Sequence, residues 1–353
     1  MSAVVEEFRK QAEVCGDLGS EFIRQILLRG AEDIEAGGVV ARLTADWPGK
    51  PRADAVSLRW AGSLHAAVLT GRDPAMAAEY PAARADWSMD RIWPLADAFL
   101  RREEAWVRAF MQSPPQTNET ARSTALAAGF MWLADRMPQP FHMLELGASA
   151  GLNLYWERFA YAYPRWGRRD VAGPLMPTEI RSGELPGWRD IAIASRAACD
   201  QNPLDASNPD HRLRLRAYVW ADQAARSERL NAALDLAQAL NVKVDKADAA
   251  VWIREKLSGE LPEGTTVVYH SVFLQYPPPP VRAAIADAIV EAGARTTPTR
   301  RLAWLSFEPE SLVAGVRGSI RFVLHAVMWN DGKRSDQTLA EVDPHGRHLD
   351  WFA

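Results

Sequence analysis

The chain has 353 residues, 48% of them hydrophobic and 24% charged, which is typical of a soluble globular protein with a large core. Its net charge of −4 excludes the global basic field that attracts nucleic acid or an anionic membrane. No stretch approaches the roughly 20 apolar residues of a membrane span, no signal peptide is expected, and neither Cys15 nor Cys199 has a CxxC neighbour. We therefore expect a cytoplasmic protein that binds neither nucleic acid nor membrane.

The first third of the chain shows helical periodicity without a strong strand pattern. Helices are expected to begin near Val4, to follow a cap at Ser20 and stop at Gly37-Gly38, and to span residues 54–70 and 90–112. Ser113-Pro114-Pro115 then breaks the pattern. We interpret residues 1–115 as an all-helical cap domain and residues 116–353 as a second domain.

A helix that begins near Asn118 leads into the stretch around which the second domain is organised. There an apolar run, residues 142–146, passes through a loop of small residues, 147–151, into helix-compatible sequence. Gly147 and Gly151 can adopt backbone conformations closed to other residues, so we predict a buried parallel strand that turns into a helix. Backbone N–H groups at such a turn can face a ligand, with Asn118 as a polar wall or a local cap.

The loop sequence restricts the kind of ligand. It lacks the Gly-Lys-Ser/Thr of a P-loop, and it misses G-x-G-x-x-G because Ser149 takes the place of the second glycine. Glu145 precedes the loop, and a carboxylate about 6 Å from a phosphate, at an effective dielectric of about 20, costs on the order of 3 kcal/mol. The same carboxylate attracts the ammonium and sulfonium groups of S-adenosylmethionine. The loop therefore favours this cofactor, with a plain packing corner as the alternative.

After a short helix, residues 161–190 predict an irregular insertion. Its clustered arginines, Arg165, Arg168 and Arg169, form either a solvated surface or a clamp for an anionic substrate. Strands and helices then alternate up to about residue 308, and Asn330-Asp331-Gly332 predicts a hairpin turn. Besides 142–147, strands are expected at residues 191–198, 241–249, 265–272, 301–308, 320–329 and 338–342. This order predicts an α/β fold with a doubly wound, mostly parallel, seven-stranded sheet.

Polar residues follow several of these strands, at the edge where such sheets bind ligands. Asp200 can accept hydrogen bonds from ribose hydroxyls, although it lies about 50 residues beyond the loop instead of about 20. His270 is the candidate general base for an acceptor hydroxyl or amine, with Tyr276 second; a hydrogen-bonded strand-end residue is the alternative for His270. Further polar residues at this edge are Asp248, Ser271 and Glu308.

Glu145-Leu-Gly-Ala-Ser-Ala-Gly151, together with the hairpin-terminated sheet, resembles the class I S-adenosylmethionine-dependent methyltransferases. The whole chain is more closely similar to a bacterial family known as domain of unknown function 2332. The stretches that carry this second resemblance are residues 116–119, 144–154, 202–205, 219–223 and 344–347.

The methyltransferase resemblance implies a small-molecule methyltransferase and a role for each matching residue. It assigns Glu145, Gly147, Ser149 and Gly151 to the methionine end, Asp200 to the ribose, and Asp248 with Ala249 to the adenine. We also expect cofactor contacts from Asn118, Ala148, Asn153 and Ser271. Ser149 stands where a glycine is usual, and no Asp/Asn-Pro-Pro-Tyr tetrad follows the fourth strand, which argues against methylation of a base or amide nitrogen.

Two other functions fit the same sequence. A non-catalytic scaffold would keep the sheet as a binding module, and a nicotinamide oxidoreductase would use the Gly-rich turn alone. We expect no metal site, because His345 and His348 lie in a terminal hairpin without an obvious further ligand.

Overall fold

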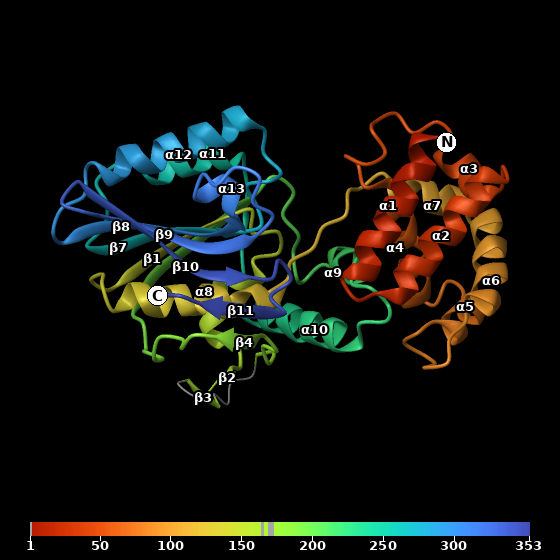
Figure 1. The fold of residues 1–353 in the computed structure, drawn as a ribbon, viewed down its shortest axis with the longest axis horizontal. Helices are drawn as coiled ribbons and strands as arrows, with labels where there is room; N and C mark the ends of the chain where they lie inside the picture. Colours follow the sequence, from red (N-terminus) through yellow and green to blue (C-terminus); the bar gives the residue numbers. More distant parts are fainter. Residues whose placement is uncertain (1, 164–165, 169–172) are drawn as a thin grey trace. The chain divides into compact units, whose positions relative to one another are not determined.

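The computed structural model describes residues 2–163, 166–168 and 173–353. Of the three arginines of the candidate clamp for an anionic substrate, Arg165 and Arg169 lie outside these residues and Arg168 lies within them. The fold is mixed α/β, with a helical region at the N-terminus and a large, mostly parallel sheet (Figure 1). Within the described residues, no helix has the length and apolar character that crossing a membrane requires.

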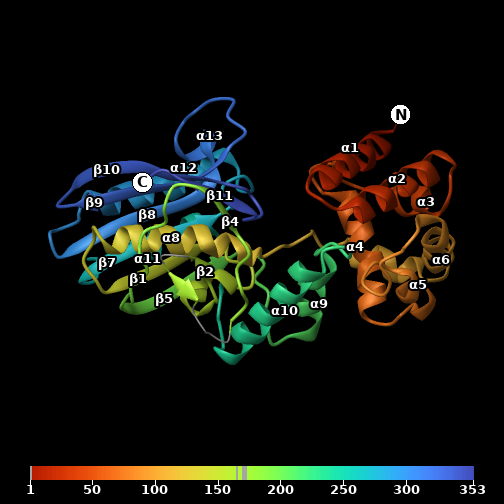
Figure 2. The same ribbon diagram turned by 60° about the horizontal axis from the view of Figure 1, so that its bottom comes forward.

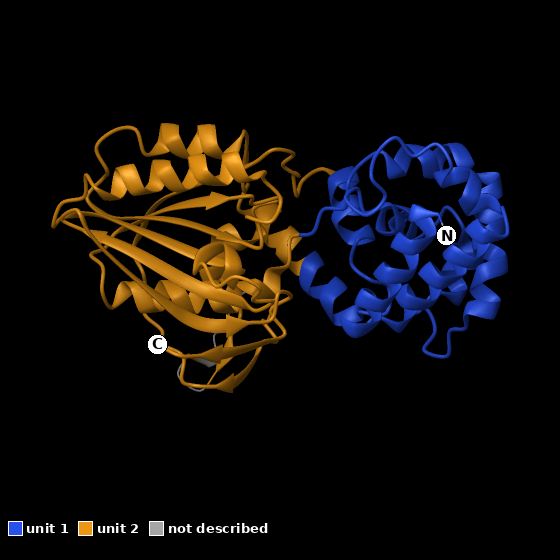
Figure 3. Ribbon diagram, turned by 45° about the horizontal axis from the view of Figure 1, so that its top comes forward, with its two compact units in different colours: residues 1–117, 209–231 blue, residues 118–208, 232–353 orange. Residues whose placement is uncertain are grey.

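The chain divides into two compact units, each formed from two segments (Figure 3). The first contains residues 1–117 and 209–231, and the second contains residues 118–208 and 232–353. Residues 209–231, part of the predicted second domain, thus group with the helical unit.

The first unit is helical. Ser20 caps a helix as predicted, because its hydroxyl accepts a hydrogen bond from the N–H of Ile23. The helix predicted over residues 90–112 is two helices, separated where Glu103 leaves helical geometry with φ −112° and ψ 25°. The elements are α1 (Ala3–Asp17), α2 (Glu21–Glu35), α3 (Val39–Thr44), α4 (Val56–Leu69), α5 (Pro74–Glu79), α6 (Met89–Arg102), α7 (Glu104–Met111), α9 (Pro209–Ala217) and the first half of α10 (Ala224–Ala239).

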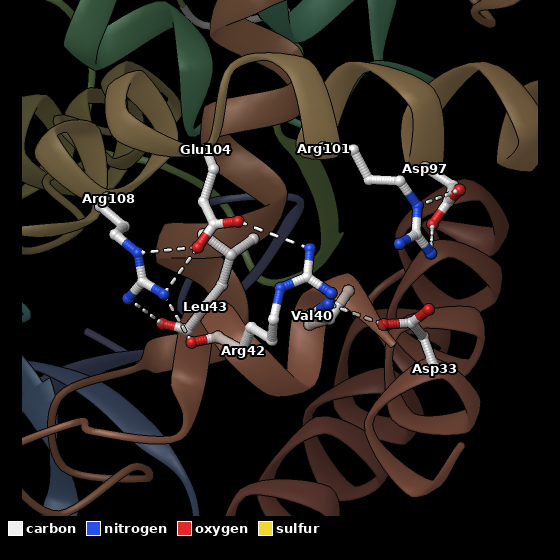
Figure 4. A network of polar contacts seen from close by, with 8 residues as sticks. All are labelled: Asp33, Val40, Arg42, Leu43, Asp97, Arg101, Glu104 and Arg108. Carbon is white, nitrogen blue, oxygen red and sulfur yellow. Dashed lines mark hydrogen bonds and ion pairs between the residues drawn. The ribbon is translucent and has the colours of Figure 1, made fainter. Parts of the chain in front are cut away.

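A surface network ties α3 to α7 in this unit (Figure 4). The guanidinium of Arg108 donates to the carboxylate of Glu104 and to the carbonyl oxygens of Arg42 and Leu43. Glu104 also pairs with the guanidinium of Arg42 at 3.5 Å. Exposed ion pairs of this kind stabilise a fold by about 0–1 kcal/mol each, so apolar packing holds the unit together.

The second unit is built on a nine-stranded sheet, counted over the described residues, instead of the seven strands predicted. The difference arises because a strand from the insertion, β4, pairs in parallel with the last strand, β11, and extends one edge. In chain order the strands are β1 (Phe141–Leu146), β4 (Glu179–Ser182), β5 (Ile193–Asp200), β6 (Asp245–Lys246), β7 (Gly264–Ser271), β8 (Arg300–Pro309), β9 (Phe322–Asn330), β10 (Lys333–Val342) and β11 (His348–Trp351), while β2 (Ala162–Tyr163) pairs only with β3 (Gly167–Arg168).

The strand order across the sheet is β4-β11-β10-β9-β8-β7-β1-β5-β6, with β8, β7, β1, β5 and β6 all parallel. Helices cover both faces: α11 (Ala249–Lys256) and α12 (Pro279–Gly293) lie on one, and α8 (Ser123–Ala134) lies on the other (Figure 1). Figure 2 shows α8 in front of the sheet. Short helical turns, η1 (Thr120–Arg122), η2 (Leu152–Arg158) and α13 (Glu310–Val313), complete the unit.

Local sequence explains the strongest elements. β7 is rich in β-branched residues and is buried along nearly its whole length, as suits a central parallel strand. The predicted hairpin joins β9 to β10, with Asp331 at φ 52° and Gly332 at φ 70°, the two positive angles of a type I′ turn. The strand predicted over residues 241–249 is shorter, because only Asp245–Lys246 pairs with the end of β5.

Candidate functional site

The order of the parallel strands locates a candidate site. Along the chain the five parallel strands follow one another as β1, β5, β6, β7 and β8. Across the sheet their order is β6-β5-β1-β7-β8, so the first strand, β1, lies beside the fourth, β7. In such sheets the connections leaving the first and fourth strands run to opposite sides, and ligands bind in the crevice at the carboxyl ends of these two strands. The candidate site therefore lies where β1 and β7 end.

The loop after β1 has an unusual backbone. Gly147, Ser149 and Gly151 all adopt left-handed conformations, with φ of 65°, 54° and 67°. Glycine accepts this region readily, whereas Ser149 is strained by roughly 1–2 kcal/mol. Such strain clusters at functional sites, and it falls at the residue where the methyltransferase resemblance expects a glycine.

The N–H groups of this loop are bonded within the protein, contrary to the expectation that they face a ligand. The carboxylate of Asp200 accepts from Ser149 N at 2.9 Å, and the side-chain oxygen of Asn118 accepts from Ala150 N at 3.3 Å and Leu152 N at 3.0 Å. Ala148 N donates to the carbonyl oxygen of Cys199, and Gly151 N to that of Ala148. The side chain of Asn118 therefore binds the loop after β1 and does not cap the helix that follows Asn118 in the chain.

Asp200 stands at the end of β5, beside the loop as predicted for a ribose acceptor. Its second oxygen accepts from Asn202 N at 2.8 Å, so each carboxylate oxygen already holds one hydrogen bond. A carboxylate oxygen has two lone pairs, and one acceptor position on each oxygen is left for a ligand.

Glu145 is enclosed near the end of β1. Its side chain is 3% exposed, and its Oε2 accepts a hydrogen bond from the hydroxyl of Tyr269 at 3.1 Å. Burial raises the pKa of Glu145 to about 8, and the negative charge of Asp200 acts in the same direction. At neutral pH the carboxyl group is therefore mostly protonated, and it becomes a counter-charge only when a cation beside it lowers this pKa.

Side chains pack directly on both loop glycines. A Cβ added at Gly147 would lie 2.2 Å from Cδ2 of Phe273, and one at Gly151 would lie 2.7 Å from Cγ1 of Val242 and 3.0 Å from Cγ2 of Val244. Any side chain at these two positions would displace a neighbour. In this conformation the glycines serve close packing, which is the alternative that the sequence left open.

His270, the first candidate base, ends in a buried hydrogen-bond network. Its ring is fully buried, with Nδ1 2.7 Å from Oε1 of Glu308 and Nε2 2.9 Å from the indole nitrogen of Trp304. Because an indole N–H can only donate, Nε2 accepts and Nδ1 carries the proton that is donated to Glu308. Both ring nitrogens are engaged, so His270 here is a hydrogen-bonded strand-end residue and not a base that faces an acceptor.

Glu308 fixes the loop that follows β7. It is fully buried, and its Oε1 also accepts from Phe273 N at 2.7 Å and Leu274 N at 3.2 Å. In the same loop Val272 has φ 54°, a conformation that a β-branched residue adopts at a cost of roughly 1–3 kcal/mol.

Tyr276, the second candidate base, is 73% exposed. The carbonyl oxygen of Ser271 accepts from the guanidinium of Arg122 at 3.2 Å.

The remaining predicted residues have structural partners. Asp248 caps α11, because its Oδ1 accepts from Ala250 N at 2.9 Å and Val251 N at 3.2 Å. Ala247 N donates to the carbonyl oxygen of Asp200, which brings Asp248 and the buried Ala249 close to the end of β5. Asn153 lies in η2 and donates from Nδ2 to the carbonyl oxygen of Glu119 at 3.3 Å.

Several buried polar atoms around the site have no hydrogen-bond partner among the described residues. They are Oγ of Ser149, Oδ1 of Asn153 and Oε2 of Glu308, on side chains that are at most 5% exposed. Native proteins contain few such atoms, and each is explained by strain, by water or by a ligand. Ser149 and Asn153 were assigned to the cofactor from the sequence, and their orphaned oxygens are acceptors that a ligand can satisfy.

Sequence reasoning missed Tyr269 and Phe273, the side chains that contact Glu145 and Gly147. Tyr269 is one apolar residue among others in a buried strand, and Phe273 lies in an irregular loop. Neither has a sequence signal of its own, because each contact depends on which strand lies next to β1.

One protein-family model, described as "Uncharacterized protein conserved in bacteria (DUF2332)", matches residues 5–351. The match covers nearly the whole chain and includes both compact units. No curated protein and no solved structure is significantly similar to the chain.

Proposed function

We propose that this chain, which belongs to the DUF2332 family, is an S-adenosylmethionine-dependent methyltransferase that acts on a small molecule. The observation that carries the proposal is the position of the loop 147–151 at the end of the central strand, where the strand order reverses. This is where doubly wound sheets bind nucleoside cofactors.

The chemistry of the side chains fits this cofactor. The orphaned oxygens of Ser149 and Asn153 and the free lone pairs of Asp200 are acceptors suited to ammonium and hydroxyl groups. The buried carboxyl of Glu145 can lose its proton beside a cation and thereby bind it more tightly. When bound, the cofactor supplies an electrophilic methyl group.

Methyl transfer is an in-line displacement that needs alignment and exclusion of water more than acid–base groups. We therefore assign His270 to holding the end of β7, since it would have to release Trp304 before it could accept a proton. Tyr276, the second candidate base from the sequence, is open to solvent, and we therefore place it ahead of His270 for proton removal from an acceptor.

A non-catalytic binding scaffold is the second candidate. The observation that favours it is the packing of the loop: its N–H groups have protein partners, and Phe273 and Val242 contact the two glycines. In a scaffold these contacts would be permanent, and no cofactor would turn over.

Titration calorimetry with S-adenosylmethionine tests the first proposal. Gly151→Leu should abolish binding, because the new side chain would meet Val242 and the backbone has φ 67°. Gly315→Leu is the matched control: its φ is 69° and an added Cβ would meet nothing within 4 Å. Unchanged affinity in Gly151→Leu would refute the loop as the site. Binding without methyl transfer to a broad panel of acceptors would favour the scaffold.

A further inference from the structure

We propose that Phe273 is a gate over the loop 147–151 and that Glu308 is the positioning residue that holds the gate closed. The inference rests on the proposed function, because it treats this loop as the binding site of the nucleoside cofactor. The structure then shows the gate in its closed position, with the ring of Phe273 on Gly147.

The gate is the aromatic ring of Phe273. The ring presses on Gly147 so closely that an added Cβ would lie 2.2 Å from Cδ2 and 2.8 Å from Cγ. Phe273 itself is half-buried: its ring packs against the edge of the sheet's apolar core, with its centroid 5.8 Å from that of the His270 ring. A ligand that lies along the loop must take the place of this ring on Gly147.

The latch is the carboxylate of Glu308. One oxygen accepts from two consecutive N–H groups, those of Phe273 and Leu274, which fixes the peptide that carries the ring. The same oxygen accepts from Nδ1 of His270, whose other nitrogen is held by Trp304. The carboxylate thus connects His270 in the sheet with the backbone N–H groups of Phe273 and Leu274.

The backbone directly before Phe273 is strained in the closed position. Val272, directly before the gate, has φ 54°, which β-branched residues disfavour, and its N–H is bonded to the carbonyl oxygen of Phe307. On the other side of the gate, Gln275 and Tyr276 are exposed. Opening would relieve the strained residue, and it would also move Val272 and Leu274, which are buried on either side of the gate.

The experiment compares three variants by titration calorimetry with S-adenosylmethionine and by hydrogen exchange of the amides of residues 148–152. Phe273→Ala removes the gate and leaves the latch, and Glu308→Gln weakens the latch and leaves the gate. Glu310→Gln is the matched control, because Glu310 is also buried and near the end of β8 but binds Ser319 and Arg321.

A gate that competes with the ligand lowers its apparent affinity, so its removal must raise it. We expect Phe273→Ala to raise the affinity at least threefold, Glu308→Gln to change it in the same direction, and both to speed exchange of the loop amides, with Glu310→Gln like the wild type. Lower or unchanged affinity in Phe273→Ala would overturn the gate, since the ring would then support the ligand or be irrelevant to it.

The exchange measurement separates the two proposals. If neither the wild type nor Phe273→Ala binds S-adenosylmethionine, the proposed function fails. Faster exchange of the loop amides in Phe273→Ala and Glu308→Gln alone would still support the closing contact. Equal exchange rates of the loop amides in the wild type and all three variants would overturn the proposed gate.

Discussion

The hydroxyl of Tyr269 donates a hydrogen bond to Oε2 of Glu145 at 3.1 Å, between residues that are paired across the neighbouring parallel strands β7 and β1. This contact joins the two strands at the place where the strand order reverses. It also holds a carboxyl group in a fully enclosed position, where burial raises its pKa to about 8. The first prediction follows from this pKa.

Binding of S-adenosylmethionine should strengthen as the pH rises from 6 to 8 and should then level off. The pKa of Glu145 in the free protein is about 8, and a bound cation lowers it, so binding releases a proton in this range. The affinity should rise by up to about tenfold per pH unit. The amino group of the ligand titrates in the same range, so calorimetry of Glu145→Gln is the reference: equal pH profiles in the two proteins would contradict the assignment.

Replacement of Asn118 by alanine should destabilise the second unit and weaken cofactor binding. The substitution leaves the N–H groups of Ala150 and Leu152 without their acceptor, at a cost of about 1–3 kcal/mol. Asn118→Asp keeps an acceptor oxygen and should retain most of the stability. Urea unfolding of the three proteins measures the difference, and a stable Asn118→Ala would show that the cap is unimportant.

The helical unit should lose stability in acid through His65. Burial lowers the pKa of His65 to about 4 in the folded protein, below the ordinary value of 6.5. The stability contributed by neutral His65 is therefore fully present above pH 6.5 and is lost as the pH falls through 4. Nδ1 must carry a proton, since it lies 3.2 Å from the carbonyl oxygen of Ala217, which only accepts.

The test is His65→Asn, which retains a donor but does not titrate. Its thermal midpoint should fall less than that of the wild type between pH 7 and pH 4. Parallel declines in the two proteins would show that another group governs acid unfolding.

The secondary structure of the second unit was largely readable from local patterns. β7 follows from its run of β-branched residues, and the β9–β10 hairpin follows from Asp331-Gly332, because both signals act through neighbouring residues. The predicted sheet is two strands too narrow, since β4 and β11 have little pattern of their own: β11 forms by pairing with β10, and β4 by pairing with β11. The break at Glu103 was also missed, because both halves of the predicted helix have the same periodicity.

The sequence by itself determined most of the helices and strands, and the edge of the sheet at which polar residues gather. It did so because periodicity, turn residues and the carboxyl ends of strands are properties of short segments. Only the tertiary structure decided what these residues contact: Tyr269 on Glu145, Phe273 on Gly147 and Trp304 on His270. Such contacts join segments far apart in the chain, and strand order and register, which no short segment encodes, bring them together.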